Sequence, residues 1–360
     1  MGILIGMDEA GYGPNLGPLV VAASAWEVAE EAGSGEQGAG SKARSSSSAT
    51  LAVRSADLSQ CDLYRHLRRA VSKTASDTQL AIADSKALYK PGSGLRQLER
   101  GVHGVLVAMG QAAGCWSEVV SVLQADACGA HSQLCWHDGF DCEIPVDARR
   151  DELESLRPRL RDVCDGAGVR PLVVRARLVF PAEFNELTDR FDSKGAALSH
   201  ITIGLLREVI DVTRREIGGG DRCLGSPLAE ASSPVFALCD KHGARNRYAA
   251  LLQHHFAEHW IETLSETHAE SRYEFGPPEC RTHVAFRMKG EDFLPTALAS
   301  MTAKYLRELS MRAFNEFWCA RVPGLRPTAG YPGDAPRFKQ AINAVQRELG
   351  VDDRVLWRNR

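Results

Sequence analysis

The chain has 360 residues, of which 44% are hydrophobic and 25% are charged, and its formal net charge is −3. This composition is typical of a folded globular protein with ample length for a hydrophobic core. No run of about 18 apolar residues occurs, and the apolar start lacks the basic flank of a signal peptide, so we expect a cytoplasmic protein without a membrane span. The ten scattered cysteines are typical of reduced thiols. The charge gives no global sign of nucleic-acid binding, so any basic surface must be local.

The N-terminal part of the chain predicts two strands and then a flexible insertion. The strands are expected at residues 3–8 and 18–26, with a Gly/Pro-rich turn between them. Residues 30–50 are rich in Gly, Ser and Ala. Because such a composition buries too little apolar surface to order itself, we expect a flexible insertion over about residues 27–57.

Beyond this insertion, segments with helical spacing of apolar residues alternate with short apolar runs. Helices are predicted at residues 58–71, 95–113, 151–165, 183–217, 245–264, 294–318 and 334–349. Strands are predicted at residues 172–180, 234–240 and 284–288. Residues 114–147 are rich in Cys, His, Trp and Gly and predict no definite element. Strands that come early and then alternate with helices favour an α/β domain with a mixed sheet.

The most informative segment is GMDEAGYGP, in which an apolar strand ends in Asp8 and Glu9 and then turns on glycines. Adjacent side chains at a strand end point to different sides, but a turn can bring both carboxylates to one ion. Glycines let backbone N–H groups approach a ligand closely, since no Cβ intrudes. An acidic turn at a sheet edge is the alternative interpretation.

Asp240 follows the same logic at the end of the predicted strand PVFALCD. Basic residues come directly after it, namely Lys241, His242, Arg245 and Arg247. A carboxylate at a strand end can hold a divalent cation while its basic neighbours contact phosphates. A simple ion pair, or a cap on the helix predicted from Arg245, explains the pattern as well.

A third acid lies in the predicted helix that contains ASMTAKYLRE, residues 299–308. Small residues at positions 299, 300, 302 and 303 would let this helix pack closely on a sheet. Glu308 lies about one turn beyond Lys304. An exposed ion pair between these two side chains, worth about a few tenths of a kcal/mol, is the alternative to a functional role.

Taken together, these segments resemble the ribonuclease HII family. Its opening motif, Asp-Glu-Ala-Gly-Arg-Gly-Pro followed by Gly-Pro, is matched closely by residues 8–14 and 17–18. The other matches, in chain order, are Asp84-Ser85-Lys86, Asn185 near the start of a long helix, Asp240, Lys289-Gly290-Glu291, the segment 299–304 and Thr328 to Pro332. Each motif alone is weak, but together they keep the family's order over nearly the whole chain.

This resemblance implies an RNase H-like α/β fold with a central mixed sheet, flanking helices and a C-terminal helical portion. It implies an endonuclease that hydrolyses the RNA strand of RNA:DNA hybrids or cuts at ribonucleotides embedded in duplex DNA. The implied site consists of four carboxylates, Asp8, Glu9, Asp240 and Glu308. Like charges this close repel and raise each other's pKa, and two Mg²⁺ or Mn²⁺ ions about 3.5–4 Å apart would remove that cost while holding the scissile phosphate.

The same resemblance implies how a substrate would bind. Backbone groups of Gly11, Tyr12 and Gly13 would read the ribose 2′-OH, which distinguishes RNA from DNA. Tyr331 would stack on the neighbouring deoxyribose. The side chains expected to contact phosphates are Lys86, Lys241 and Arg245.

Three features depart from the family pattern. Tyr12 replaces the Arg usually found between the two glycines, and Glu308 stands where the family has Asp. The chain is also much longer than a typical member. We expect a single domain over residues 1–350, with the extra residues at about 27–57, 114–171 and 218–233, and a C-terminal tail at 351–360.

These departures leave two other functions open. One is a nucleic-acid-binding protein on the same fold with weak or no catalysis, although the intact Asp8, Glu9 and Asp240 argue against it. The other is a nuclease for another structured nucleic acid, which only the insertions suggest.

Several other patterns favour ordinary structural roles. A possible zinc-ligand group, which lacks a Cys-x-x-Cys pair, comprises Cys128, His131, Cys135, His137 and Cys142. His255 and His259 share a predicted helix face, but no Glu follows His255 as in metalloproteases. A second Asp-Ser-Lys triplet occurs at residues 192–194. We expect it to lie inside a helix and interpret its occurrence as chance. The arginines between residues 149 and 177 predict a solvated face, with a nucleic-acid-binding surface as the alternative.

Overall fold

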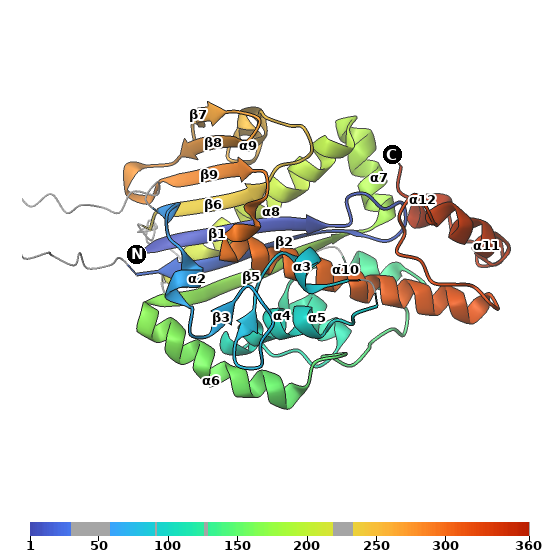
Figure 1. Ribbon diagram of the computed structural model, residues 1–360. Helices are drawn as coiled ribbons and strands as arrows, with labels where there is room; N and C mark the ends of the chain where they lie inside the picture. Colours follow the sequence, from blue (N-terminus) through green and yellow to red (C-terminus); the bar gives the residue numbers. More distant parts are fainter. Residues whose placement is uncertain (30–57, 91, 126–128, 219–232, 360) are drawn as a thin grey trace, which may run out of the picture.

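The computed structural model describes residues 1–29, 58–90, 92–125, 129–218 and 233–359. Its centre is a seven-stranded mixed sheet with the strand order β5-β2-β1-β6-β9-β8-β7 (Figure 1). The strands are β1 Gly2–Ala10, β2 Leu19–Val28, β5 Val169–Val179, β6 Val235–Asp240, β7 Glu262–Glu266, β8 Glu270–Phe275 and β9 Thr282–Arg287. Helices flank this sheet on both faces. This arrangement confirms the expected α/β class with a central mixed sheet and flanking helices.

The direction of the strands decides which residues meet at each edge of the sheet. β1 is parallel to β6, and β6 is parallel to β9. β2 and β5 on one side, and β8 and β7 on the other, continue the sheet in antiparallel pairs. The carboxyl ends of the three parallel strands therefore lie at one edge. In Figure 1 this edge is on the right, where α11, α12 and the C-terminus also lie.

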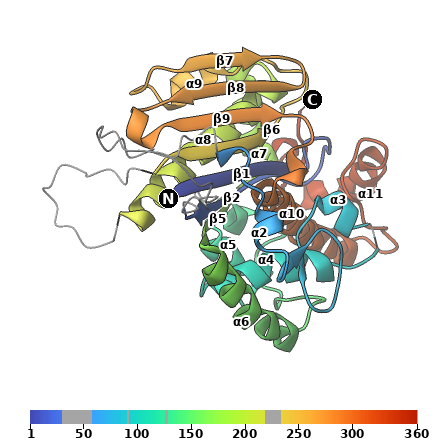
Figure 2. The same ribbon diagram turned by 60° about the vertical axis from the view of Figure 1, so that its left-hand side comes forward.

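The two faces of the sheet carry separate hydrophobic cores, which explains why β1 and β2 are apolar at almost every position. Leu4 belongs to the core shared with α4, α6 and α10, whereas Ile3, Ile5 and Met7 belong to the core shared with α8 and α9. The bounds of these helices are α4 Arg96–Ala108, α6 Arg150–Ala167, α8 Lys194–Ile217, α9 Ala249–His255 and α10 Leu294–Arg321. Figure 2 shows the two groups of helices from a second direction.

Helix α10 packs unusually close to β1, as its small residues predict. A Cβ added at Gly6 would lie 1.9 Å from the backbone nitrogen of Thr296. The hydroxyl of Ser24 on β2 donates a 2.8 Å hydrogen bond to the carbonyl of Pro295. Ser300 and Ala303 of the same helix are also buried. This close approach brings the middle of α10 beside the carboxyl end of β1.

The remaining elements surround this framework. The helices are α2 Leu63–His66, α3 Ser85–Leu88, α5 Trp116–Val122, α7 Pro181–Phe191, α11 Ala335–Glu348 and α12 Asp353–Leu356. A separate parallel pair consists of β3 Val71–Ser72 and β4 Leu80–Ala81, and short 3-10 turns lie at Ala130–Gln133 (η1), Pro278–Cys280 (η2) and Gly290–Asp292 (η3).

Two helix predictions are wrong over much of their length. Among the described residues of the predicted helix 58–71, only Leu58 and Leu63–His66 are helical, and Val71 begins β3. The predicted helix 245–264 is reduced to α9, and Glu262 begins the edge strand β7. β7 is mostly exposed and carries no apolar alternation, so pairing with β8, rather than any local pattern, makes it a strand.

The long helix predicted at residues 183–217 is two helices. Asp192 adopts a left-handed conformation with φ 52°, which ends α7. The hydroxyl of Ser193 accepts a hydrogen bond from the Ala196 N–H and caps α8. The second Asp-Ser-Lys triplet therefore forms a helix junction, and its expected place inside a helix is wrong.

Some expectations fall partly outside the described residues. Of the insertion expected at residues 27–57, only Glu27 and Val28, which end β2, and Ala29 are described. Residues 219–232 and Cys128 also lie outside. Within the described part of the chain, no helix is long and apolar enough to cross a membrane. The eight cysteines of that part form no disulfide.

Candidate active site

Three of the predicted carboxylates come together at the carboxyl ends of two parallel strands. Asp8 and Glu9 lie near the end of β1, and Asp240 is the last residue of β6. The strand register pairs Met7 with Cys239, which puts Asp8 beside Asp240. One carboxylate oxygen from each of the three acids lies within 4.8 Å of the other two. Parallel pairing thus unites acids that are more than two hundred residues apart in the sequence.

The two adjacent acids of β1 leave the strand on opposite faces. Because side chains alternate along a strand, Asp8 follows Leu4 and Gly6 toward α10, while Glu9 follows Met7 toward α8. The backbone N–H of Glu9 donates a 2.8 Å hydrogen bond to Oδ1 of Asp8. Both carboxylates nevertheless reach the group shared with Asp240.

Burial shifts all three carboxyl groups toward their neutral forms. Desolvation raises the pKa of Asp8 to about 7 and the pKa of Glu9 to about 8. Hydrogen bonds from Ser300 and from the Glu9 backbone lower the pKa of Asp8, whereas the charge of Asp240 raises it further. Desolvation also raises the pKa of Asp240. These are hard oxygen ligands that carry full charge together only when a cation compensates them, so the donor set fits Mg²⁺ or Mn²⁺.

A fourth acid beside this group is Glu291, which the sequence motifs include but which was not expected in the site. Its charge raises the pKa of both Asp8 and Asp240. Glu291 lies in η3, a few residues after the end of β9, the third parallel strand. Lys289, with φ 61°, makes the turn between that strand and η3. Glu291 could have been recognised in the sequence by its position shortly after a strand, since Asp8 and Asp240 also lie at strand ends.

The first Asp-Ser-Lys motif lies beside the carboxylates. The hydroxyl of Ser300 on α10 accepts a 3.3 Å hydrogen bond from the Ser85 backbone and lies 3.0 Å from the Ser85 hydroxyl. These contacts fix the start of α3 beside the carboxylates. Burial lowers the pKa of Lys86, but the surrounding carboxylates, including Asp8 and Glu291, outweigh it and raise the pKa overall. Lys86 therefore interacts electrostatically with the acidic group, and its positive charge lowers the pKa of Glu9.

Glu308 is not part of the group formed by the other three predicted carboxylates. Lys304 forms an ion pair with its Oε1, and the Tyr89 hydroxyl donates a 2.8 Å hydrogen bond to its Oε2. Eight residues along α10 separate it from Ser300, which corresponds to about 12 Å of helix. In this arrangement Glu308 forms the ion pair with Lys304, which was the alternative to a functional role.

The Gly-rich loop after β1 packs closely against other parts of the chain. Gly11 has φ 85°, and a Cβ there would lie 2.7 Å from the Pro18 carbonyl oxygen. Tyr331, which is 51% exposed, has its ring 3.7 Å from the position of a Cβ on Gly13. The structure therefore brings together the loop and the tyrosine that were expected to bind the sugar.

Two buried arginines, neither of which was expected in the site, hold this loop in place. Arg307 on α10 donates hydrogen bonds to the carbonyls of Pro18, Leu16 and Ala329. Arg358, near the C-terminus, donates to the carbonyls of Gly11 and Pro14. Burial lowers the pKa of Arg358 to about 9. The residues that follow α12 are therefore part of the structure around the site.

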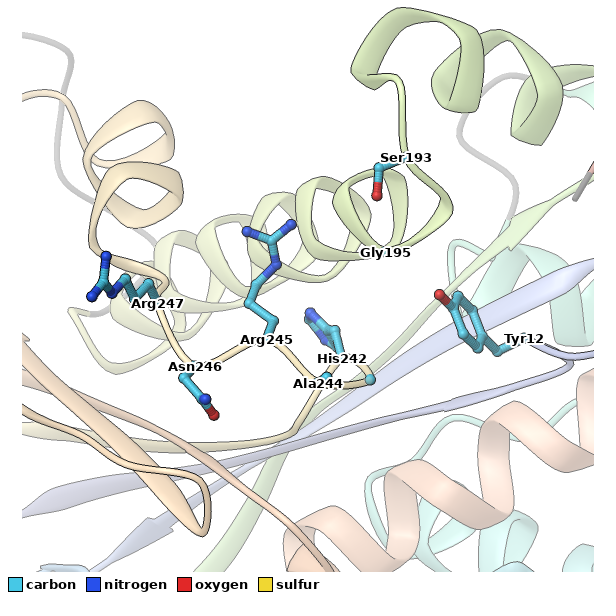
Figure 3. A pocket seen from close by; sticks show the side chains of 9 residues that line it. Tyr12, Ser193, Gly195, His242, Ala244, Arg245, Asn246 and Arg247 are labelled. Atoms are coloured by element: carbon cyan, nitrogen blue, oxygen red, sulfur yellow. The ribbon is translucent and has the colours of Figure 1, made fainter.

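An open groove of about 560 Å³ adjoins the acids on the α8 side (Figure 3). Its lining comprises Tyr12, Ser193, Gly195 and residues 242–247. Figure 3 shows Arg245 extending from its loop toward α8, with Tyr12 across the groove. Burial and the charge of Glu9 raise the pKa of Tyr12, which ties the groove to the acidic group. Besides Arg245 and Arg247, Lys194 adds a further cation, with its Nζ 4.7 Å from the centre of the Tyr12 ring.

Lys241, the remaining predicted phosphate contact, is buried at 8% exposure and is not brought to the groove. Its ammonium donates hydrogen bonds to Oδ1 of Asn246, at 2.7 Å, and to the carbonyl of Thr267, at 2.6 Å. These contacts tie the loop after β6 to the β7–β8 hairpin. The direction of this side chain depends on that hairpin, which the sequence pattern did not predict.

The other patterns in the sequence have structural explanations in the described residues. His137 stacks on Trp116, and its Nε2 lies 3.2 Å from the Ser310 hydroxyl. The described Cys and His residues of the 128–142 segment form no metal-ligand group. Four of the arginines between 149 and 177 form ion pairs, namely Arg149 with Asp151, Arg157 with Glu154, Arg170 with Glu27 and Arg177 with Glu183.

Comparison with known proteins was made by sequence and by structure. No protein-family model and no curated protein matches this sequence. Among solved structures, the chain is similar to ribonuclease H2 from Pyrococcus horikoshii OT3, with 15% identity, a TM-score of 0.40, and coverage of 98% of this chain and 92% of that one. It is also similar to RNase HII from Archaeoglobus fulgidus, solved as a complex with PCNA, with 14% identity, a TM-score of 0.36, and coverage of 99% and 94%. Bst-RNase HIII in complex with Mn²⁺ has 11% identity, a TM-score of 0.36, and coverage of 99% and 66%. At these identities the likeness concerns the overall fold alone.

Proposed function

We propose that this protein is a metal-dependent endonuclease of the RNase H type, which hydrolyses the RNA strand of RNA:DNA hybrids or cuts at ribonucleotides embedded in duplex DNA. The meeting of Asp8, Glu9 and Asp240 at one sheet edge carries this proposal. Three carboxylates whose pKa values are raised by burial are costly to keep ionised, and a divalent cation removes that cost. The resemblance of the sequence motifs to ribonuclease HII names the reaction.

Asp8, Glu9 and Asp240 are the residues that would hold the metal. When bound, a pair of Mg²⁺ or Mn²⁺ ions would supply an activated water and stabilise the leaving oxygen. Glu291 is near enough to influence Asp8 and Asp240 electrostatically and is available as a further acid. Glu308, the fourth ligand implied by the resemblance, would first have to leave Lys304 and Tyr89.

The surroundings of the acids suit a strand that contains ribose. The two buried arginines hold the loop of Gly11, Tyr12 and Gly13 in place, and its backbone would read a 2′-OH. Tyr331 is exposed beside Gly13 and offers a face for stacking on the next sugar. Lys86 on one side and Arg245 on the other would contact phosphates, which gives local basic character to a chain of net charge −3.

Cleavage of labelled duplexes tests this proposal. The panel contains an RNA:DNA hybrid, DNA with one ribonucleotide and all-DNA, each with Mg²⁺ or Mn²⁺. We expect cutting on the 5′ side of the ribonucleotide, no cutting of all-DNA, and loss of at least about a thousandfold in rate for Asp8→Asn. Asp353→Asn removes an acid that is paired with Lys339 and lies outside the carboxylate group, so it is the control and should cut normally.

A second candidate function, nucleic-acid binding without efficient catalysis, is favoured by the engagement of Glu308 with Lys304 and Tyr89. In that case the wild-type protein would bind the same duplexes, as measured by fluorescence anisotropy, yet cut none of them with either metal. Asp8→Asn would then bind no more weakly than the wild type. Cleavage by the wild type would exclude this alternative.

A further inference from the structure

A cluster of three imidazoles lies beyond the groove, between α8 and α9. It consists of His200 on α8 and of His254 and His255 at the end of α9, and it is called the histidine triad below. One ring nitrogen of each residue lies within 4.8 Å of those of the other two. Nδ1 of His200 lies 3.1 Å from Nε2 of His255. The ring centroids are 5.1 Å (200 to 254), 5.3 Å (200 to 255) and 5.0 Å (254 to 255) apart.

We propose that the histidine triad binds one transition-metal ion of the Zn²⁺ class, separate from the carboxylate site. Tetrahedral zinc with Zn–N bonds of about 2.0–2.1 Å separates its ligand nitrogens by about 3.3 Å, and the centres of its imidazole rings by about 5 Å. The three rings already have this spacing, and the closest nitrogen pair differs from it by only a few tenths of an ångström. The ion would replace the hydrogen bond between His200 and His255.

The protonation of the triad suits metal binding, because a metal needs the neutral imidazole. Burial lowers the pKa of His255 to about 4 and also lowers the pKa of His200. The charges of His254, Arg190 and Arg245 lower the pKa of His200 further. At neutral pH both rings are therefore neutral, and when a metal binds, the proton of their hydrogen bond moves to the other nitrogen of its ring.

One of the cations near the triad is compensated by acidic side chains. Arg207 on α8 forms ion pairs with Glu258, at 2.8 Å, and with Asp211, at 3.3 Å. It also donates a 2.6 Å hydrogen bond to the carbonyl of His255, which fixes the end of α9. These pairs compensate the cation nearest to His255, so it opposes a bound metal only weakly.

The geometry of the rings also indicates which metals are preferred. His200 is held by stacking on Phe191, with ring centroids 3.8 Å apart and planes 11° apart. His254 is exposed, so the fourth coordination position would open to solvent and take a water. Three nitrogen ligands without a carboxylate favour Zn²⁺, Ni²⁺ or Cu²⁺ over Mg²⁺, whereas the carboxylate site has the opposite preference.

The site depends on tertiary packing and not on the helical pair that the sequence presents. His255 and His259 were expected on one helix face, but α9 ends at His255, and His259 stacks on Phe275 instead. A metal at the triad would clamp α9 to α8. The loop that carries Arg245 leads directly into α9, so the clamp would also hold one wall of the groove.

Calorimetric titration of the full-length, chelator-stripped protein with Zn²⁺ tests this inference. Excess Mg²⁺ keeps Zn²⁺ off the carboxylates, and the titration is repeated in Asp8→Asn. We expect one Zn²⁺ per chain in both proteins and an affinity lower by about a hundredfold or more in His254→Ala. The matched control His259→Ala should bind as the wild type does. Co²⁺ in place of Zn²⁺ should give the intense visible absorption of a tetrahedral site, absent in His254→Ala.

Two results would overturn the inference. One is that Asp8→Asn binds no Zn²⁺, since all binding would then belong to the carboxylate site and the triad would be only a packed cluster of rings. The other is undiminished binding by both His254→Ala and His200→Ala. Because His254 is exposed, its replacement should not unfold the protein, and circular dichroism of the variant checks this.

Discussion

Replacing Asp8 by Asn should stabilise the metal-free protein while abolishing its activity. The pKa of this carboxyl rises from 3.8 to about 7, first through desolvation and then through Asp240 and Glu291. Since one pH unit corresponds to about 1.4 kcal/mol, an ionised Asp8 costs the folded state at most about 4 kcal/mol. Its side chain keeps some contact with solvent, so we expect Asn to add about 1–3 kcal/mol to the free energy of unfolding.

The gain should depend on pH with a definite sign. A carboxyl with a raised pKa stabilises the fold fully below its unfolded pKa and loses that contribution as the pH rises through the folded value. For Asp8 this window extends from about pH 4 to just above pH 7. The difference between Asp8→Asn and the wild type should therefore be small at pH 4 and reach its maximum near pH 8.

Urea unfolding in EDTA at pH 4, 6 and 8 measures this difference directly. Addition of Mg²⁺ or Mn²⁺ at pH 8 should stabilise the wild type, by about 1.4 kcal/mol at tenfold the dissociation constant, and the Asn variant much less. Asp353→Asn is the matched control, because hydrogen bonds from Gln346 and Lys339 lower the pKa of Asp353 and its replacement should destabilise slightly. If Asp8→Asn is the less stable protein at pH 8 without metal, the carboxylates are a structural network and the argument for a metal site fails.

Three further predictions concern the packing, the groove and the fourth acid. Gly6→Ala should reduce the free energy of unfolding by about 3 kcal/mol or more, because the new Cβ would overlap the α10 backbone. Urea unfolding measures this change. The control Gly333→Ala, where the Cβ meets nothing within 4 Å, should leave the free energy of unfolding nearly unchanged. Arg245→Ala should weaken binding of an RNA:DNA hybrid about 3- to 10-fold and lower the salt dependence of binding by about one phosphate contact, as followed by anisotropy, whereas the ion-paired surface residue Arg149 can be replaced by Ala without effect. If Glu291 is the further acid of the site, the cleavage rate of Glu291→Gln should be about tenfold or more below that of the wild type. An unchanged rate for Glu291→Gln together with a reduced rate for Glu308→Gln would instead identify Glu308 as the further acid.

Local patterns in the sequence were enough to predict much of the framework. The apolar runs of β1 and β6, the acids that end them and the small residues of α10 all lie within single elements. Their meaning depends on spacing along one strand or helix, which the sequence presents directly. For the same reason the Gly-rich loop at Gly11 was recognisable, since a left-handed backbone position at a close contact requires glycine.

Long-range packing decided the composition of the site. Asp8 and Asp240 meet only because β1 and β6 pair in parallel with one particular register. Glu291 lies beside them because β9 is the next parallel strand, while Glu308 is held away by Lys304 and Tyr89. Neither relation can be read from spacing within an element.

Long-range packing also decided the contacts of side chains whose neighbours in the sequence suggested other partners. Lys241 follows Asp240 directly, yet the β7–β8 hairpin draws its ammonium away from the groove. His255 was paired on a helix with His259, but it meets His200 from another helix. The sequence determined which residue types were present and which elements carried them. The tertiary structure decided which of them meet, because side-chain direction depends on the elements packed around each residue.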